Sequence, residues 1–228
     1  MEENENEDNF EESMDIDNEE SIKVVLLGES GVGKTSIISK FTKGLFNQDI
    51  MSTNGATFST KKKEFKEQNK ILSFEIWDTA GQEKYRSLAK MFFKDAAVTL
   101  LVYDITNKDS FIEIKDYWMD LVKENGPEQV IMYIVGNKYD LSEKEGVNEE
   151  EVRKYAQSQN ISLWFTSAKD STGIDELFEE IGKKYLSPEF TNSEEIIQRK
   201  IRKNEVNKIN KEEELKNNNK KQNKKKCC

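Results

Sequence analysis

The sequence predicts an α/β fold in which a mostly parallel, six-stranded sheet carries helices on both faces. Six short segments have the pattern of strands, and amphipathic helical segments alternate with most of them along the chain. This alternation is typical of parallel sheets that are covered on both sides. Two neighbouring strand segments have no helix between them, which predicts that one strand pairs as an antiparallel hairpin.

The amino-terminal half supplies three of these strands and one helix. Residues 22–27 are a nearly unbroken apolar run, as expected for a strand buried on both faces. A glycine-rich loop follows, and residues 34–42 have the pattern of a helix that starts on that loop. Segments 60–66 and 71–77 alternate apolar and polar residues on either side of Gln68-Asn69, which predicts the hairpin with one wetter face.

The carboxyl-terminal half continues the alternation of strands and helices. We expect buried strands at 98–103 and 130–135, and a shorter buried strand at 162–165. Apolar residues at helical spacing predict amphipathic helices, which lie at 110–123, 149–159 and 174–186. In a sheet of this kind ligands bind at the carboxyl ends of the strands, so the loops that follow them are the first candidates for a site.

Composition excludes several kinds of chemistry. The 228 residues contain no histidine, so a histidine base, a Ser–His pair or a histidine-ligated metal cannot exist here. The two cysteines are Cys227 and Cys228, which rules out a zinc site or disulfide framework in the body of the chain and fits a reducing, cytosolic compartment. No run of about 18 apolar residues and no signal peptide is recognisable, so we expect neither a secreted nor a membrane-spanning chain.

Charge divides the chain into three parts. The formal net charge is -9, but residues 1–20 hold eleven acidic and no basic side chains, whereas residues 191–228 are rich in lysine. We therefore expect an acidic, disordered extension at 1–20, one folded domain at 21–188 and a flexible polar and basic tail at 189–228. The acidic balance argues against nucleic acid as a partner.

The loop after the first strand has the sequence of a phosphate-binding loop. Residues 28–35 read Gly-Glu-Ser-Gly-Val-Gly-Lys-Thr and match the pattern G-x-x-x-x-G-K-[ST]. Small residues let backbone N–H groups converge on a phosphate, and the following helix adds its positive end. Lys34 is expected to reach the β- and γ-phosphates, and the Thr35 hydroxyl is expected to bind Mg²⁺.

A second loop predicts which base the nucleotide carries. Asn137-Lys138-Tyr139-Asp140 follows a buried strand, where a ligand-contacting loop belongs. The Asp140 carboxylate can accept hydrogen bonds from N1 and N2 of guanine, whereas adenine lacks that donor pair. Asn137 can bond the base or tie the loops together, and the Lys138 stem can lie over the base. Ser167-Ala168-Lys169 would complete the pocket, with the Ala168 N–H on guanine O6.

A third loop predicts hydrolysis. Residues 77–83 read Trp-Asp-Thr-Ala-Gly-Gln-Glu. Asp78 can hold the metal through water, the Gly81 N–H can meet the γ-phosphate, and Gln82 can orient the attacking water by geometry rather than basicity. Thr53, in the loop before the hairpin, can ligate Mg²⁺ through its hydroxyl and contact the γ-phosphate through its amide.

These loops, in this order and spacing, resemble those of the Ras superfamily of small GTPases over about residues 21–186. The stretch 77–88, the Lys-Gly-Leu-Phe at 43–46 and the paired cysteines are most similar to the Rab family, and residues 52–58 and 87–91 resemble its early-endosomal subgroup. Asn54 and the basic run 61–63 depart from the Rab pattern. In that family, the strand that contains residues 61–63 faces effector proteins.

The resemblance implies a P-loop NTPase G domain that binds and hydrolyses GTP and regulates vesicle traffic. It implies Mg²⁺ ligation by Thr35, Thr53 and Asp78, packing of Phe46 by the guanine, and catalysis by Gln82 with Lys34 and Thr53. The implied partners are an exchange factor, a GTPase-activating protein, a GDP dissociation inhibitor or escort protein and effectors of the GTP form, acting on a monomer. The full nucleotide-binding set is Glu29, Ser30, Gly31, Val32, Gly33, Lys34, Thr35, Ser36, Phe46, Thr53, Gly81, Asn137, Lys138, Asp140, Ser167, Ala168 and Lys169.

The paired cysteines predict a lipid anchor. Cys227-Cys228 is not a C-a-a-X box but matches a Rab prenylation end, for which the family pattern is geranylgeranyl on both cysteines. Two chains give stable anchoring, and nearby lysines favour an anionic leaflet. The expected location is the cytosol and the cytoplasmic face of intracellular, endosomal membranes.

Two other functions remain open at this point. A nucleotide-holding scaffold that scarcely hydrolyses would share the same loops, although the presence of Gln82, Thr53 and Lys34 argues against it. A P-loop kinase for a nucleoside or small molecule would share only the phosphate loop, and the Asn137-Lys138-x-Asp140 motif argues against that alternative.

Overall fold

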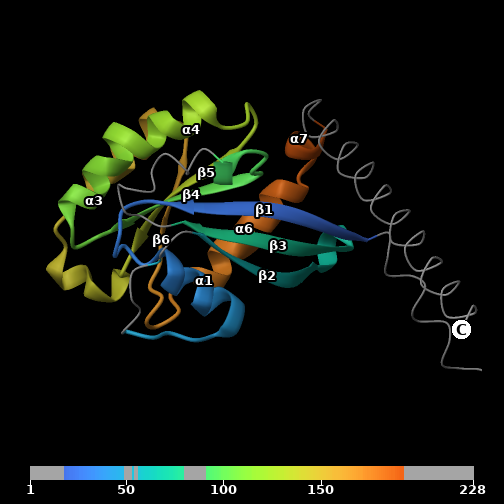
Figure 1. The fold of residues 1–228 in the computed structure, drawn as a ribbon, viewed down its shortest axis with the longest axis horizontal. Helices are drawn as coiled ribbons and strands as arrows, with labels where there is room; N and C mark the ends of the chain where they lie inside the picture. Colours follow the sequence, from blue (N-terminus) through green and yellow to red (C-terminus); the bar gives the residue numbers. More distant parts are fainter. Residues whose placement is uncertain (1–17, 49–52, 54–55, 80–90, 193–228) are drawn as a thin grey trace, which may run out of the picture. The chain divides into compact units, whose positions relative to one another are not determined.

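The computed structural model describes residues 18–48, 53, 56–79 and 91–192. Within these residues six strands form one sheet in the order β2-β3-β1-β4-β5-β6 (Figure 1). Neighbouring strands run parallel, except that β2 and β3 form the antiparallel pair. The predicted α/β fold, with a mostly parallel six-stranded sheet and one antiparallel hairpin strand, is confirmed.

The strands extend beyond the apolar runs that predict them. β1 begins three residues before the predicted strand, because residues 19–21 continue the backbone ladder with residues 71–73 of β3. β6 lies at the edge of the sheet, so its side chains are only half-buried or exposed and the prediction of a buried strand there is wrong. The bounds are β1 (Glu19–Leu27), β2 (Ala56–Phe65), β3 (Lys70–Thr79), β4 (Val98–Asp104), β5 (Ile131–Asn137) and β6 (Ser162–Phe165).

The helices follow the predicted segments closely. The helix predicted at 110–123 is present, but a π-helical turn of five residues, η3 (Ile114–Trp118), divides it into two α-helices. Apolar periodicity does not reveal such a turn, since Phe111, Ile114 and Trp118 are buried all the same. The α-helices are α1 (Lys34–Lys43), α3 (Lys108–Glu113), α4 (Met119–Asn125), α5 (Glu149–Ser158) and α6 (Ile174–Leu186), and the short 3₁₀ turns are η1 (Lys66–Gln68) and η4 (Tyr139–Lys144).

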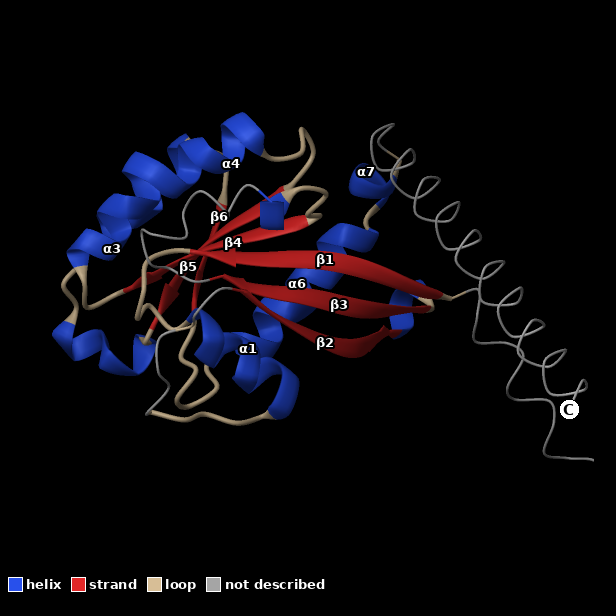
Figure 2. Cartoon of the chain, viewed as in Figure 1, coloured by secondary structure: helices blue, strands red, loops and turns tan. Residues whose placement is uncertain are grey.

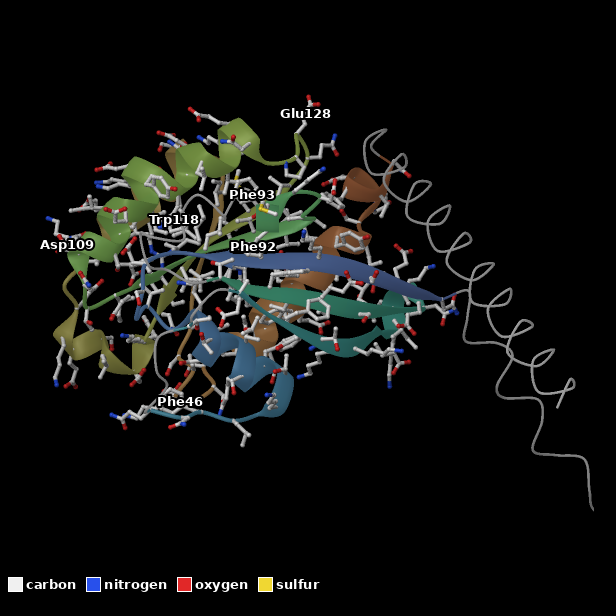
Figure 3. All side chains as sticks on the ribbon, viewed as in Figure 1. Phe46, Phe92, Phe93, Asp109, Trp118 and Glu128 are labelled. Carbon is white, nitrogen blue, oxygen red and sulfur yellow. The ribbon has the colours of Figure 1, made fainter. Side chains whose placement is uncertain are left out.

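Helices cover both faces of the sheet (Figure 2), and a layer of buried hydrophobic side chains lies on each face. On one face α1 and α6 pack through Phe41 and Phe178, whose rings stack with centroids 3.6 Å apart and meet the edge of Phe74 from β3. On the other face α3, α4 and α5 cover a cluster that includes Trp118 and Phe93 (Figure 3). Aromatic pairs contribute about 0.5–1.5 kcal/mol each beyond simple burial. Both layers therefore stabilise the packing of the helices on the sheet that carries the loops of the site.

The basic run at 61–63 is largely neutralised within the fold. Because successive residues of a strand face opposite sides, only the middle lysine lies on the side of Phe58, away from α6. The other two face α6 and pair with its carboxylates. The ion pairs are Lys61 with Asp175 at 3.9 Å, Lys62 with Glu19 at 2.8 Å and Lys63 with Glu179 at 2.9 Å.

The chain divides into two compact units, Met1–Tyr185 and Leu186–Cys228. The sheet and its covering helices belong to the first unit. The second contains the short helix α7 (Pro188–Thr191), which begins with a proline behind the capping side chain of Ser187. Among the helices of the described residues, none has the length and apolarity that crossing a bilayer requires.

Candidate nucleotide-binding site

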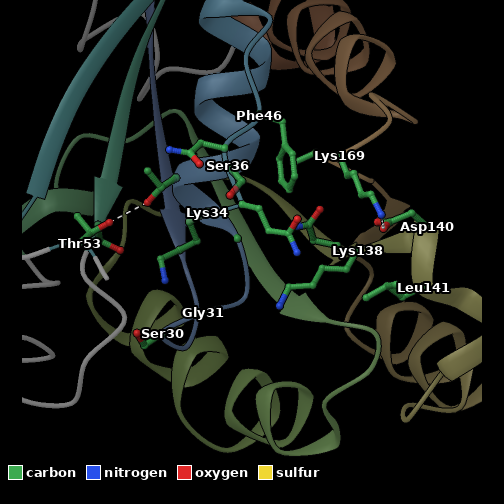
Figure 4. A pocket seen from close by; sticks show the side chains of 17 residues that line it. Ser30, Gly31, Lys34, Ser36, Phe46, Thr53, Lys138, Asp140, Leu141 and Lys169 are labelled. Atoms are coloured by element: carbon green, nitrogen blue, oxygen red, sulfur yellow. Dashed lines mark hydrogen bonds and ion pairs between the residues drawn. The ribbon is translucent and has the colours of Figure 1, made fainter. Parts of the chain in front are cut away.

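A pocket of about 380 Å³ lies at the carboxyl ends of the parallel strands, within the usual size range of small-molecule sites (Figure 4). Its walls come from the loop after β1, the segment after α1, and the loops after β5 and β6. In Figure 4, Thr53 lies on one side and Asp140 with Lys169 on the opposite side. The predicted residues that line it are Ser30, Gly31, Gly33, Lys34, Thr35, Ser36, Phe46, Thr53, Asn137, Lys138, Asp140, Ala168 and Lys169.

Four other predicted residues do not line the pocket. Val32 is buried, and its carbonyl accepts a hydrogen bond from Asn137 Nδ2 at 2.8 Å, so its side chain does not face the pocket. Glu29 contributes its backbone carbonyl, and Asp78 and Ser167 act on residues that do line the pocket. The predicted Gly81, Gln82, Cys227 and Cys228 lie outside the described residues.

Glycine is required at two places in the phosphate loop. Gly28 has φ 144°, and a Cβ there would lie 2.1 Å from the carbonyl oxygen of Val102 in β4. Gly33 has φ 96°, and a Cβ would lie 2.3 Å from Asn137 Nδ2. The loop can therefore pass closely over β4 and the Asn137 side chain before α1 begins at Lys34. This placement sets the start of a helix, with its free N–H groups, against the pocket.

Lys34 is held at the centre of this loop. Its Nζ donates to the carbonyl oxygens of Gly28 at 2.7 Å and Glu29 at 2.8 Å, and the side chain is buried. Burial lowers the pKa of Lys34 to about 8, against the opposing attraction of the Asp78 and Glu29 carboxylates. A phosphate beside this ammonium would favour its charged form and raise the pKa again.

The lowered pKa of Lys34 predicts proton uptake when a nucleotide binds. Between pH 8 and 10.5 the folded chain holds fewer protons on Lys34 than the unfolded chain, so this group increases the stability of the unliganded fold as pH rises. Binding of the phosphates reverses this, and affinity should fall by up to about tenfold per pH unit above 8. Calorimetric titration with GDP in two buffers of different ionisation enthalpy should show close to one proton taken up at pH 9 and almost none at pH 6.5. Equal heats in the two buffers at pH 9 would contradict the assignment.

Two hydroxyls and one carboxylate meet beside the phosphate loop. Thr35 Oγ1 donates to Asp78 Oδ2 at 2.6 Å, and the hydroxyl oxygens of Thr35 and Thr53 are 2.7 Å apart. Burial raises the pKa of Asp78, although the hydrogen bond from Thr35 and the charge of Lys34 oppose this. Asp78 Oδ1 is buried and has no hydrogen-bond partner among the described residues. An orphaned carboxylate oxygen next to two hydroxyls is a donor set of the kind that Mg²⁺ prefers, so these residues fit the ion.

The opposite end of the pocket is built around Asp140. Ser167 Oγ, which is fully buried, donates to Asp140 Oδ1 at 2.8 Å, and Lys169 Nζ lies 3.7 Å from Oδ2. These contacts orient the carboxylate as a hydrogen-bond acceptor at the pocket wall. Asn137 ties the loops together, because its Nδ2 bonds Val32 and its Oδ1 accepts from Thr166 Oγ1 at 3.1 Å.

Several residues of the site were not predicted. Asn47, Gln48, Thr79 and Leu141 also line the pocket, and each lies within two residues of a predicted residue, which is the signal that could have found them. Asp104 was also missed. It is the last residue of β4, at the carboxyl edge where ligands bind, and it pairs with Lys138.

Comparison with known proteins agrees with this geometry. The family model described as "Ras family" matches residues 23–187. Ras-related protein Rab-31 of Homo sapiens is 44% identical over 163 residues, which are 72% of this chain and 82% of the relative. Ras-related protein Rab-22A of Mus musculus is 41% identical over 166 residues (73% and 84%), and Ras-related protein Rab5 of Nicotiana tabacum is 43% identical over 162 residues (71% and 80%).

The matched residues contain the phosphate loop, the loop of Asp140 and the hydroxyl–carboxylate cluster, which consists of Thr35, Thr53 and Asp78. The family match covers most of the chain, and the similar proteins are Rab proteins from an animal and a plant lineage. The chain therefore belongs to the Ras family and within it to the Rab GTPases, which bind GTP and GDP with Mg²⁺, hydrolyse GTP and act in membrane traffic with exchange factors, activating proteins, dissociation inhibitors and effectors.

Proposed function

We propose that the pocket holds one guanine nucleotide between two fixed ends. At one end the backbone of residues 29–36 and the Lys34 ammonium bind the phosphates, and at the other the Asp140 carboxylate accepts from the base. The observation that carries this proposal is the pocket itself, which Lys34 and Asp140 both line. Phe46 and Lys138 would flank the base, and the Ala168 N–H would meet guanine O6.

The hydroxyl–carboxylate cluster is the proposed metal site. Thr35, Thr53 and Asp78 would hold Mg²⁺, which supplies charge neutralisation to the β- and γ-phosphates when bound. Thr53 belongs to the segment between α1 and β2, so its contact with Thr35 and Asp78 links that segment to the phosphate end. Loss of the γ-phosphate on hydrolysis would weaken this link. We propose that residues 46–58 and 81–92 are ordered in the GTP state and relax in the GDP state for this reason.

Gln82 is the proposed catalytic residue for hydrolysis, with the Gly81 N–H on the γ-phosphate; both lie outside the described residues. Gln82→Leu should slow single-turnover GTP hydrolysis by at least about tenfold, because leucine cannot orient water, while GTP binding persists. Radiolabelled GTP in excess enzyme measures this rate, and Gln68→Leu, in the exposed turn η1, is the matched control. Hydrolysis by Gln82→Leu at the wild-type rate would refute the role.

Wild-type hydrolysis should itself be slow, at about 10⁻⁴ to 10⁻³ s⁻¹, and should need a partner's arginine for acceleration.

The ends of the chain have a proposed role in membrane recruitment. Cys227 and Cys228 would carry geranylgeranyl groups, and the lysines beside them would favour an anionic cytoplasmic leaflet. We place the protein, as a monomer, on early-endosomal membranes, which is supported by the resemblance of residues 52–58 and 87–91 to that subgroup. The folded domain would span 21–188, between an extension at 1–20 and a tail at 189–228. The intact mass of protein isolated from its own cells tests the lipid assignment.

A further inference from the structure

The side chain of Lys138 is held at both ends. Its backbone has φ 67°, a left-handed conformation that lysine adopts rarely. The Lys138 carbonyl accepts from the Leu141 N–H at 2.8 Å, and the Tyr139 N–H donates to the Thr166 carbonyl at 3.0 Å, so the loop fixes this conformation. At the far end, the Lys138 ammonium lies 2.6 Å from Asp104 Oδ2.

Asp104 is placed for this contact by the sheet. It ends β4 and is in register with Asn137, the last residue of β5, so the residue after Asn137 starts beside it. Its side chain is 10% exposed, whereas the Lys138 side chain is 34% exposed and lines the pocket. Asp104 itself does not line the pocket. It is therefore a second layer behind the wall against which the base would lie.

The turn after β4 does not need the second carboxylate oxygen. Asp104 Oδ1 alone accepts from the Thr106 N–H at 2.9 Å and the Thr106 hydroxyl at 2.7 Å. The chain contains a matching turn at Asp170, whose Oδ1 accepts from the N–H and hydroxyl of Thr172 at 3.0 and 2.7 Å. That second aspartate is exposed, and no lysine partner is found for it within the described residues. What distinguishes Asp104 is thus Oδ2, which is directed at Lys138.

We propose that Asp104 is a positioning residue for guanine-nucleotide retention, because it clamps the Lys138 ammonium and so holds the lysine stem rigid along the pocket wall. A lysine stem has four flexible carbons, and anchoring its charged end removes most of the conformations that would leave the wall open. The paired carboxylate also neutralises the ammonium at the wall. This inference rests on the proposed function of the pocket and adds a residue that acts on the nucleotide only through Lys138.

The test is the dissociation rate of fluorescent GDP from the full-length, Mg²⁺-loaded protein. Asp104→Asn keeps an acceptor for Thr106 but presents a neutral amide to Lys138. It should accelerate dissociation about five- to twentyfold, the range expected for loss of one charge-assisted hydrogen bond in a partly exposed pair. The control is Asp120→Asn, which neutralises an exposed carboxylate of α4 that does not line the pocket and should leave the rate within about twofold.

A double-mutant cycle separates positioning from a merely structural effect. Lys138→Met retains an apolar stem without the anchored charge and should accelerate dissociation by a similar factor, and adding Asp104→Asn to it should cause no further acceleration. Equal acceleration by Asp104→Asn in both backgrounds, or none in either, would overturn the proposal. If Asp104→Asn alone fails to fold, wild-type retention of GDP by Lys138→Met would overturn it as well. Failure of the wild-type protein to retain GDP would instead refute the function proposed for the pocket.

Discussion

Replacing Asp140 by asparagine should exchange the base that the pocket selects. In the proposed complex the Asp140 carboxylate would accept from two guanine N–H groups, and Ser167 already donates to one of its oxygens. An asparagine amide places an N–H₂ group against the guanine N2 donor, whereas xanthine has a carbonyl at that position and can accept from it. GDP affinity should fall roughly a thousandfold, because a buried polar mismatch leaves both partners unpaired, and xanthosine diphosphate should become the tighter ligand.

Competition against a fluorescent nucleotide measures this exchange in base preference. Asp109→Asn provides the control, since Asp109 is exposed in the first turn of α3 and does not line the pocket (Figure 3). It should bind GDP as the wild type does. An Asp140→Asn variant with unchanged preference for guanine would remove the carboxylate from the account of base selection.

Replacing Lys34 by methionine should weaken nucleotide binding strongly while changing the stability of the fold little. The Lys34 ammonium is buried among backbone carbonyls, and burial disfavours its charged form. Methionine fills similar space and removes the cost of burying the ammonium, but it leaves the Gly28 and Glu29 carbonyl oxygens without their donor, so the midpoint of thermal unfolding in the absence of nucleotide should change little. GDP and GTP affinity should nevertheless fall by roughly a thousandfold, the loss of a desolvated charge pair with two phosphates.

This separation of affinity from stability is the informative feature of Lys34→Met. Lys43→Met, at the exposed end of α1, is the matched control and should change neither quantity. Parallel loss of fold stability and affinity in Lys34→Met would show that Lys34 acts as a structural residue. Calorimetry with GDP and a thermal melt of the unliganded protein provide the two readouts.

The fold could be predicted from the sequence because its determining features are local. The apolar run 22–27 and the alternation at 71–77 identify buried strands and the hairpin, and helical spacing identifies α5 and α6 within one residue at either end. Unlike the local π-helical turn η3, two other missed features of the fold depend on partners distant in sequence. The extension of β1 comes from its ladder with β3, and the half-burial of β6 comes from its position at the sheet edge.

The same distinction holds in the site. Residues in contiguous motifs, such as Lys34 and Asp140, could be assigned from their neighbours and from the chemistry of phosphates and guanine. The pairing of Asp104 with Lys138 could not, because it joins two loops that become adjacent only through the register of β4 and β5. The ion pairs of Lys61 and Lys63 could not be predicted either, because their carboxylate partners lie on α6, which is distant in sequence.

The most direct test of this account is equilibrium competition between GTP and ATP for the wild-type pocket. With fluorescent GDP bound in the presence of Mg²⁺, GTP should displace the probe at comparable concentration, whereas ATP should require at least about a thousandfold excess, because adenine cannot supply the donor pair that Asp140 accepts. Displacement by ATP as readily as by GTP, or no binding of either nucleotide, would contradict the central claim.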